Sequence, residues 1–454
     1  MVVCTPLKVT QEMGYTMHTI ALKFGGSSLA DAEHFCKVAA IVKADPARRF
    51  VVASAPGKRS SGDIKVTDLL YRCYDLAAAG ESFGSVLEQI RARFDEIAHE
   101  LKLDLDLTDE FDAIRLHLVQ EPNRDYMASR GEYLNSKLLA AYLERPFIDP
   151  ALYIRFDENG VYDADTTLRL LGGALADLDG AVIAGFYGAL PDGTVHTFSR
   201  GGSDVTGAIV AAAIHADLYE NWTDVSGMLA ADPRVVREPK VIDYITYHEL
   251  RELSYTGASV MHEEAVFPVR RAGISINIRN TNRPEDPGTM IVASMPSILR
   301  PRIVTGIAGK KGFSCILVEK SMMNGELGFA MRLMRILTDH GISIEHCPTG
   351  IDTMSVYVST AELTPARDAV LREIRAELQP DTVIIEDDLA LMAVVGQGMS
   401  YSKGIAARIF TALAEARINI HMIDQGSSEQ NIIIGVQSED LEDSIRAVYA
   451  AVIR

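Results

Sequence analysis

The stretch "IALKFGGSSLAD", residues 20–31, joins an apolar run to two glycines, two serines and the start of a helical pattern. Residues 19–24 have the composition of a buried strand, and apolar residues recur at helical spacing over 29–45. Glycines after a strand let backbone N–H groups turn inward, and the first amides of a helix carry the positive end of its dipole. Together with Lys23 they predict an anion site where a strand ends. A structural turn with a surface lysine is the alternative.

Length and composition limit the classes of protein that need to be considered. A chain of 454 residues is too long for one core, and 48% hydrophobic with 23% charged residues is typical of globular domains. The formal net charge of −18 argues against nucleic acid and anionic membranes as partners. We find no apolar run of about 18 residues that could span a membrane. Any anionic substrate must therefore be held by backbone amides, a metal and a few placed cations.

The N-terminus and the cysteines bear on localisation. Residues 1–18 have mixed polarity and no apolar core, so we expect a disordered or start-site extension and not a secretory signal. The five cysteines are scattered and never spaced C-x-x-C, which favours a reducing cytoplasm over disulfides or structural zinc. We therefore predict a cytoplasmic protein with no dedicated metal site.

The first two-thirds of the chain alternate short apolar runs with helical segments. Strands are expected at 19–24, 48–57, 180–190 and 274–282, a helical region at about 66–143, and a turn, helix and strand over 201–225. This alternation predicts an α/β fold in which helices cover a mainly parallel sheet.

The last third contains an internal repeat. Residues 329–346 and 405–422 align without a gap, each as an amphipathic helix, a break and an alternating strand. Each copy has a preceding strand (314–319 and 389–396), a following strand (353–358 and 430–436) and a final helix (365–378 and 438–453). Two β-α-β-β-α-β units are therefore predicted. Two copies are too few for a solenoid and suggest a paired small-molecule-sensing module.

Three further stretches carry candidate chemistry. "FSRGGSDVTG" (198–207) is a second double glycine that opens a helix, with Arg200 and Asp204 beside it. "WTDVSGMLAADPRVV" (222–236) places Asp224 and Arg234 around a glycine loop, and "MASRGEYLNSKLLAAYL" (127–143) places Glu132 in the first turns of a helix. Singly, each charge is explained by a loop salt bridge or by compensation of the helix dipole. In combination they predict phosphoryl transfer from a nucleotide to a small acid.

The motifs "KFGGSS", "RGE", "GFYG", "FSRGGSD", "WTDVSGMLAADPR" and "NIRNTNRPEDPGT" occur in an order and spacing that resembles the aspartate kinases. The resemblance runs from about Thr19 to the C-terminus, and "YTGASVMHEEAVFPV" (255–269) resembles the monofunctional, often lysine-sensitive group. It implies an amino-acid-kinase-type three-layer α/β/α sandwich with a mainly parallel sheet, followed by two tandem ferredoxin-like (βαββαβ) ACT domains. The implied boundaries are 1–18 for the extension, 19–296 for the catalytic domain, and 297–385 and 386–454 for the ACT domains.

The resemblance also implies an activity and its residues. ATP with Mg²⁺ would phosphorylate the β-carboxylate of L-aspartate, the first step of lysine, threonine and methionine biosynthesis. Lys23 would contact the transferring phosphoryl group, and Asp204 would order Lys23 and the metal-nucleotide. The remaining implied contacts to aspartate are Ser54, Thr67, Glu132, Phe186, Arg200, Gly202 and Ser203; those to the nucleotide are Gly25, Gly26, Ser27, Thr223, Asp224, Leu229, Arg234 and Ser259.

Two positions depart from the family pattern. Many relatives carry a lysine in "GAKVLH", where this chain reads "GASVMH" and places Ser259. Many also carry a tyrosine near the adenine, where this chain has Leu229. These changes put the details of nucleotide binding in doubt and leave the phosphoryl-transfer residues intact.

The repeats resemble ACT units, which bind amino acids between copies. Gly328 and Phe329 would offer helix-start amides, Glu345 would take the effector's ammonium group, and Thr349 lies on the next loop. A second acid, Glu326, favours lysine over threonine as the effector. The alternative is a degenerate regulatory region that only dimerises the chain. We expect a homodimer through the ACT domains, with a tetramer as the larger alternative.

Two competing functions remain open from the sequence. Another amino acid kinase, acting on glutamate, N-acetylglutamate or carbamate, is disfavoured by the ACT pair and by "SRGGSD" with an upstream "RGE". A catalytically silent amino-acid sensor is disfavoured because Lys23, Arg200 and Asp204 are all retained.

Overall fold

The computed structural model describes residues 18–199, 201–258, 261, 263–296 and 302–453. The predicted extension, apart from its last residue, and the site residues Arg200 and Ser259 lie outside the described residues. The chain divides into two compact units, the first running to Trp222 with Arg271–Ile274, the second comprising Thr223–Arg270 and Ser275–Arg454. The predicted boundaries at 296 and 385 describe sequence modules and stay predictions.

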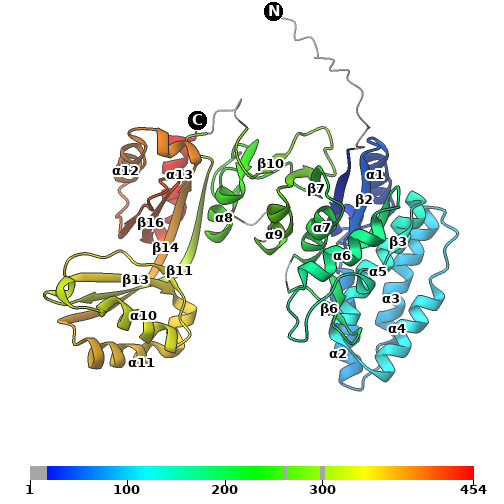
Figure 1. Cartoon of the computed structure of the whole chain (residues 1–454), viewed down its shortest axis with the longest axis horizontal. Coiled ribbons are helices and arrows are strands. Elements are labelled where there is room, and N and C mark those ends of the chain that lie inside the picture. The colour runs from blue at the N-terminus through cyan, green and yellow to red at the C-terminus, as the bar shows by residue number, and fades with distance from the viewer. Residues whose placement is uncertain (1–17, 200, 259–260, 262, 297–301, 454) are drawn as a thin grey trace, which may run out of the picture. The chain divides into compact units, whose positions relative to one another are not determined.

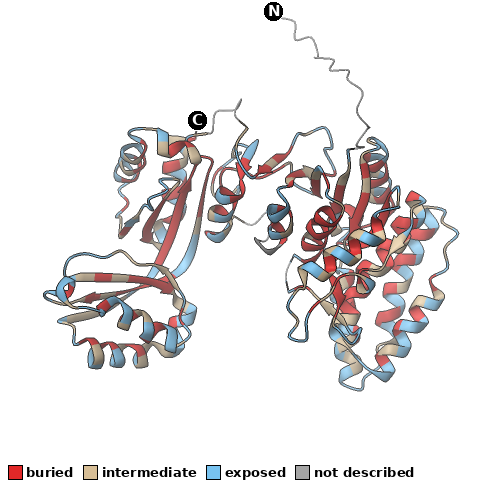
Figure 2. Cartoon of the chain, in the orientation of Figure 1, coloured by how far each residue is buried: buried red, intermediate tan, exposed pale blue. Residues whose placement is uncertain are grey.

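A parallel sheet forms the centre of the first unit. Its strand order is β3 (Phe147–Ile148), β4 (Ala181–Ala184), β2 (Arg48–Ala53), β1 (Ile20–Phe24) and β7 (Leu218–Thr223). Strands β4, β2, β1 and β7 are almost wholly buried, as expected for parallel strands covered on both faces (Figure 2). The strand predicted at 19–24 is confirmed as β1, and the one predicted at 48–57 is confirmed as β2, which ends earlier, at Ala53.

The single strand predicted over residues 180–190 is wrong, because the structure divides this segment into two strands. Residues 180–190 form β4 and a separate short β5 (Tyr187–Ala189), which pairs with β6 (Val195–Thr197) in a second sheet. The break falls at Phe186, whose φ of 84° is incompatible with an extended strand. An apolar run alone cannot reveal such a reversal of the backbone.

Two groups of helices cover the sheet of the first unit (Figure 1). Helix α5 (Arg124–Leu143) packs on β2 and β4, and α7 (Gly202–Ala213) packs on β1 and β2, which is the layering expected for an amino-acid-kinase fold. The predicted helical region 66–143 is resolved into four helices. The other helices of this unit are α1 (Ala32–Lys43), α2 (Val66–Ala78), α3 (Gly84–Glu100), α4 (Thr108–Gln120) and α6 (Ala164–Leu175), with 3-10 turns η1 (Gly26–Leu29) and η2 (Pro150–Leu152).

The second unit begins with a small three-stranded group. Strand β10 (Thr289–Val292) pairs antiparallel with β9 (Ser275–Asn280) and parallel with β8 (Tyr244–Thr246). Helix α8 (Tyr247–Tyr255) follows β8 directly and starts with a capping box between Thr246 and Glu249. Helix α9 (Glu263–Ala272) precedes β9.

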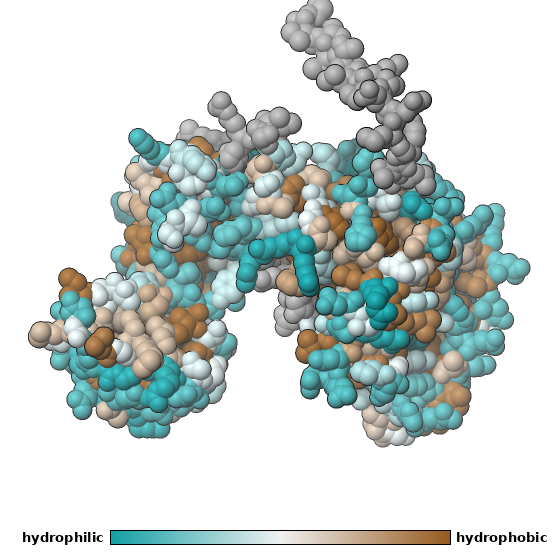
Figure 3. All heavy atoms as spheres, in the orientation of Figure 1, coloured by the Kyte–Doolittle hydropathy of each residue, from teal (hydrophilic) through white to brown (hydrophobic). Residues whose placement is uncertain are grey.

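The two predicted repeats share one six-stranded sheet. Its order is β12 (Ile344–His346), β13 (Thr353–Ser359), β11 (Gly306–Glu319), β14 (Thr382–Val395), β16 (Asn431–Gln437) and β15 (Met422–Asp424). The helices are α10 (Phe329–Asp339), α11 (Thr360–Leu378), α12 (Ile405–Glu415) and α13 (Leu441–Val452), with 3-10 turns η3 (Met323–Gly325), η4 (Gln397–Tyr401) and η5 (Ser438–Asp440). Hydrophilic side chains cover most of the visible outer face of α11, as its amphipathic pattern requires (Figure 3).

Strands β11 and β14 each serve both repeats. The second half of β11 pairs with β13 and with the first half of β14, whereas residues 306–311 of β11 pair with the second half of β14. The second half of β14 then pairs with β16. The second repeat is therefore completed by a segment of chain that precedes the first repeat. None of the described helices is both long and apolar enough to cross a bilayer.

Candidate active site and regulatory contacts

Lys23 and Asp204 meet at the centre of the first unit. Lys23 is the fourth residue of β1, and Asp204 lies in the first turn of α7. Lys23 Nζ and Asp204 Oδ1 are 2.6 Å apart, and Asn221 Nδ2 of β7 donates to the same oxygen at 2.9 Å. Lys23 is buried, so the ammonium group is held in one position beside the sheet's carboxyl edge. The sequence placed Lys23 and Asp204 together but missed Asn221, because a single amide in a strand has no local signature.

The glycine turn after β1 is tightly packed. A Cβ at Gly26 would lie 2.7 Å from the carbonyl oxygen of Ala55, and the N–H of Gly57 donates to the carbonyl of Gly26 at 2.8 Å. The N–H of Gly25 donates to the carbonyl of Trp222 at 3.0 Å, so this amide is committed to the fold. Of the predicted cradle, Gly26 and Ser27 remain as the opening residues of η1, where helical amides have no intrahelical acceptor.

Glu132 is a buried carboxylate near Lys23. It lies on α5, is 6% exposed, and its Oε2 has no hydrogen-bond partner among the described residues. Burial raises its pKa to about 8, and hydrogen bonds from the amides of Ala55 and Glu132 itself and the charges of Lys23 and Arg130 offset this only in part. A buried acid with an unpaired oxygen is expected to bind a cation or donor supplied by a ligand.

The turn after β4 brings three predicted substrate residues together. A Cβ at Gly185 would meet Ser203 Oγ at 2.6 Å, and a Cβ at Gly202 would meet the ring of Phe186 at 2.4 Å. The amide of Phe186 donates to Thr206 Oγ1 at 3.0 Å, which holds the left-handed residue against α7.

The other predicted substrate residues are placed less tightly. Asn135 of α5 donates to the carbonyl of Ser54 at 2.7 Å, so Ser54 lies between β2 and the helix that carries Glu132. Thr67 lies in the first turn of α2 and is partly buried. Arg200 lies outside the described residues, and its role stays a prediction.

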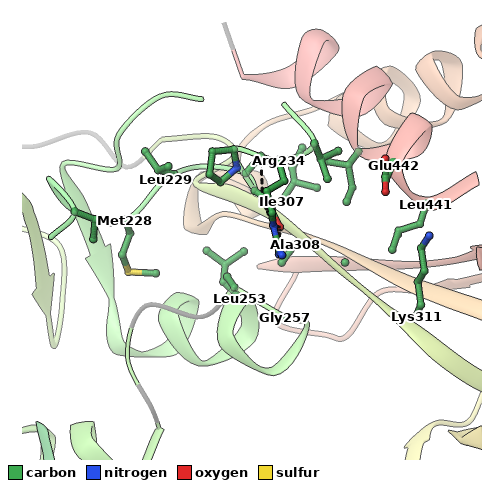
Figure 4. A pocket seen from close by; sticks show the side chains of 18 of the residues that line it. Met228, Leu229, Arg234, Leu253, Gly257, Ile307, Ala308, Lys311, Leu441 and Glu442 are labelled. Carbon is green, nitrogen blue, oxygen red and sulfur yellow. Dashed lines mark hydrogen bonds and ion pairs between the residues drawn. The ribbon is translucent and has the colours of Figure 1, made fainter. Parts of the chain in front are cut away.

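Two of the predicted nucleotide residues line a cavity in the second unit. Thr223 Oγ1 donates to Asp224 Oδ1 at 3.2 Å, and Arg234 Nη2 lies 2.6 Å from Asp232 Oδ2. Leu229 and Arg234 border a cavity of about 680 Å³, together with residues of α8, β11 and α13 (Figure 4). Figure 4 shows Leu229 near one end of this cavity and Lys311 and Glu442 near the other. The sequence did not indicate that regulatory strands would contribute to this cavity.

Two of the predicted effector residues are already engaged. Glu326 is paired with Lys320 Nζ at 2.6 Å and with Arg332, and these cations hold the pKa of its carboxyl below its ordinary value. The amide of Phe329 donates to the carbonyl of Glu326 at 3.3 Å. Two side chains of the same repeat therefore already neutralise Glu326, and its contact with an effector stays a prediction.

Glu345 has a different partner. Its Oε2 accepts a short hydrogen bond from the hydroxyl of Tyr255, the last residue of α8. Gly328 is the N-cap of α10 and has the left-handed conformation, and Thr349 forms an isolated antiparallel β-bridge with Met354. A link between Glu345 and α8 could not be predicted from the sequence, since 90 residues separate the two side chains.

Comparisons with known proteins show the family of the chain. The family model described as the amino acid kinase family matches residues 18–280, and an ACT domain model matches residues 392–452. Aspartokinase 3 of Bacillus subtilis is 40% identical over 444 residues, which is 94% of this chain and 97% of that protein. The crystal structure of Clostridium acetobutylicum aspartate kinase, described as an allosteric enzyme, is 47% identical with a TM-score of 0.89 and covers 95% of this chain and all of that one.

A more distant structure gives the same fold. E. coli aspartokinase III in complex with aspartate and ADP is 26% identical with a TM-score of 0.74, covering 96% of this chain and 100% of that chain. The same enzyme has also been solved with lysine and aspartate, where the TM-score is 0.71. The chain therefore belongs to the amino acid kinase family and, within it, to the aspartokinases with an allosteric ACT regulatory region.

Proposed function

We propose that this aspartate kinase transfers the γ-phosphoryl group of ATP to the β-carboxylate of L-aspartate at the Lys23–Asp204 centre, giving 4-phospho-L-aspartate and ADP. The observation that carries this proposal is the 2.6 Å contact between Lys23 and Asp204 beside the glycine turn of β1. A pair in two separate clefts could not act on one ligand.

The reaction needs charge control more than proton transfer. The acceptor carboxylate is ionised at neutral pH and needs no general base. The difficulty is to bring two anions together and to neutralise the charge on the transferring group. Buried Lys23 supplies a fixed positive charge, and the opening amides of η1 supply oriented dipoles. Asp204 and Asn221 keep the lysine in position.

Aspartate is recognised by side chains of opposite charge. Glu132 binds the ammonium group, because its Oε2 has no partner among the described residues and a bound cation would stabilise the ionised form that burial disfavours. Arg200 pairs with the α-carboxylate, as the family motif implies. Ser54, Thr67, Phe186, Gly202 and Ser203 shape the remainder of the pocket.

The nucleotide is bound as its Mg²⁺ complex. Mg²⁺ usually keeps several waters and is held by one or two carboxylates plus the phosphates of the substrate. Asp204 fits this requirement, because Lys23 and Asn221 both contact its Oδ1 and neither contact uses Oδ2. Bound Mg²⁺ would neutralise phosphate charge. Thr223, Asp224, Leu229, Arg234 and Ser259 contact the nucleotide by motif match, and E. coli aspartokinase III has been solved with ADP.

Turnover of ATP tests the reaction. ADP release should require L-aspartate, and hydroxylamine should trap the acyl phosphate as a hydroxamate. Glutamate, N-acetylglutamate and carbamate serve as competing acceptors. Preference for one of these over aspartate, or hydroxamate formation without ATP, would contradict the proposal.

An amino acid regulates the enzyme through the first repeat, and Glu345 binds its ammonium group. Lysine is the first candidate, since E. coli aspartokinase III has been solved with lysine, and threonine is the second. The repeat exposes Met322, Leu327, Met331 and Ile351, which supports a homodimer formed through this surface. Activity titrated with each amino acid separately distinguishes the effectors, and no response to either would leave the repeats as a dimerisation region.

A further inference from the structure

Three side chains of helix α8, spaced three residues apart, form hydrogen bonds with regulatory strands and turns. Glu249 Oε1 accepts from Thr305 Oγ1 at 2.7 Å and from the amide of Gln397 at 2.9 Å. Glu252 Oε2 accepts from Asn431 Nδ2 at 2.6 Å, and Tyr255 donates to Glu345. The spacing of three residues places all of these contacts near one face of the helix.

The two ends of α8 are held differently. Glu249 is 2% exposed and also accepts from Thr246, so the start of the helix is locked in the interior. Tyr255 is 57% exposed, and its hydrogen bond to Glu345 lies at the surface. The first end is buried, whereas the hydrogen bond at the second end is accessible to solutes.

The segment that follows the exposed C-terminal end of α8 lines the cavity. The segment after α8 contributes Gly257 and Ala258 to its lining, beside Leu253 of the helix itself (Figure 4). The amide of Ala258 donates to the carbonyl of Leu253 at 2.9 Å. Gly257 has φ of 111°, and a Cβ there would lie 3.0 Å from the carbonyl oxygen of Gly309 on β11. Because Ala258 is hydrogen-bonded to Leu253, a movement of the end of α8 would also move the wall formed by Gly257 and Ala258.

We propose that Tyr255 is a positioning residue for the nucleotide cavity, and that the effector and Tyr255 compete for the carboxylate of Glu345. While Tyr255 is hydrogen-bonded to Glu345, the end of α8 is held in place and the Gly257–Ala258 wall has the shape that binds the nucleotide. An effector ammonium group on Glu345 displaces the phenol, and the wall loses its support. This inference rests on the proposed placement of the effector at Glu345 and of the nucleotide beside Leu229 and Arg234.

The chemistry of the contact suits a competition. Burial and the hydrogen bond to Glu345 raise the pKa of Tyr255 to about 12, so its hydroxyl is a donor at neutral pH. An ammonium group is a stronger partner for a carboxylate than a neutral phenol. Because coupling is reciprocal, whatever weakens the Tyr255 contact must favour the effector and disfavour the nucleotide.

Three variants of the full-length enzyme test the proposal. In Tyr255→Phe the KM for ATP should rise about three- to tenfold with a much smaller change in kcat, because a hydrogen bond to a charged group is lost. The concentration of L-lysine or L-threonine that halves activity should fall by a similar factor. Glu345→Gln should abolish inhibition, because an amide oxygen can accept from Tyr255 but does not attract an ammonium group. Tyr401→Phe, at a tyrosine 84% exposed, is the matched control and should change neither quantity.

The outcomes separate the two proposals. If Tyr255→Phe behaves as wild type while Glu345→Gln loses inhibition, the effector site stands and the role of Tyr255 is wrong. If Glu345→Gln is still inhibited, the effector binds elsewhere and both ideas fall. Calorimetric titration of nucleotide into Tyr255→Phe, with its melting temperature, ensures that a raised KM reflects weaker binding and not partial unfolding.

Discussion

Lys23 is the residue on which the chemistry depends most. Its buried ammonium group can stabilise charge that develops only in the transition state, so Lys23→Ala should lower kcat by roughly 10²-fold or more. ADP release coupled to NADH oxidation measures this. Lys37→Ala, at a surface lysine of α1 paired with Glu33, is the control and should leave kcat unchanged. Near-normal turnover in Lys23→Ala would show that the reaction takes place at another site.

The ionised form of Glu132 should lower the free energy of unfolding and, at the same time, contribute to the binding of aspartate. Burial raises its pKa from 4.5 to about 8, so between these values the folded protein binds more protons than the unfolded chain. The free energy of unfolding therefore falls as pH rises through this window. In Glu132→Gln this contribution is absent, and the drop in melting temperature between about pH 5 and about pH 8 should be smaller than in wild type.

The same substitution should weaken aspartate binding. The KM for aspartate should rise roughly tenfold or more, because a charge-assisted contact to the ammonium group is lost. Glu88→Gln, at an exposed position of α3, is the control for both measurements. A wild-type KM for aspartate in Glu132→Gln would assign the ammonium group to another residue.

At the residue scale, the sequence identified side chains that belong to recognisable motifs and missed side chains that lie outside any motif. Lys23, Asp204 and Glu132 belong to local patterns that have a physical meaning. Asn221 and Tyr255 depend on partners far along the chain, and no local pattern marks them. The pairing of Glu326 with Lys320 and Arg332 likewise follows from the fold of the repeat, and no local pattern marks it.

The turn after β1 is the element that tolerates least change. In Gly26→Ala the new Cβ would lie 2.7 Å from the carbonyl oxygen of Ala55 and 3.2 Å from the nitrogen of Gly57, both of which are backbone atoms. We expect a loss of about 1–3 kcal/mol in the free energy of unfolding, with weaker ATP binding. Gly62→Ala, where no atom lies within 4 Å of the added Cβ, is the control for urea denaturation. Equal urea midpoints for the two variants would show that the turn can relax.

At the element scale, periodicity predicted most strands and helices. Buried parallel strands such as β1 and β2 are apolar throughout, and α10 and α12 repeat the same amphipathic pattern. The segment 180–190 was read as one strand because its residues are apolar, yet Phe186 reverses the backbone. Hydrophobicity reports burial, and it does not report a change of direction inside the core.

For the whole molecule, the assembly can be tested at the first repeat. Leu327 is 98% exposed and Met331 is 68% exposed, so a charge at either position costs the monomer little. In Leu327→Glu the dissociation constant of the proposed homodimer should rise about tenfold or more, as measured by sedimentation. Val119→Glu, at an apolar residue of α4 that is 68% exposed, should leave the association unchanged. A dimer unaffected by Leu327→Glu would form through another surface.

At this scale the sequence predicted an α/β catalytic part followed by a duplicated sensing part, and both are confirmed. It did not reveal that the copies are interleaved, since a repeat in sequence is read as two consecutive blocks. The pairing of residues 306–311 with the second half of β14 depends on a choice of strand neighbours that hydrophobic pattern leaves open.

That interleaving restricts how the enzyme can be taken apart. A fragment cut at residue 386 would keep every helix of the second repeat and lose the β11 segment that borders its sheet, leaving β14 with an unpaired edge prone to aggregation. Gene duplication could have produced the two copies, but exchange of one copy between related enzymes by recombination would have to carry part of the other with it. The sensing half should thus be inherited, and engineered, as one indivisible cassette.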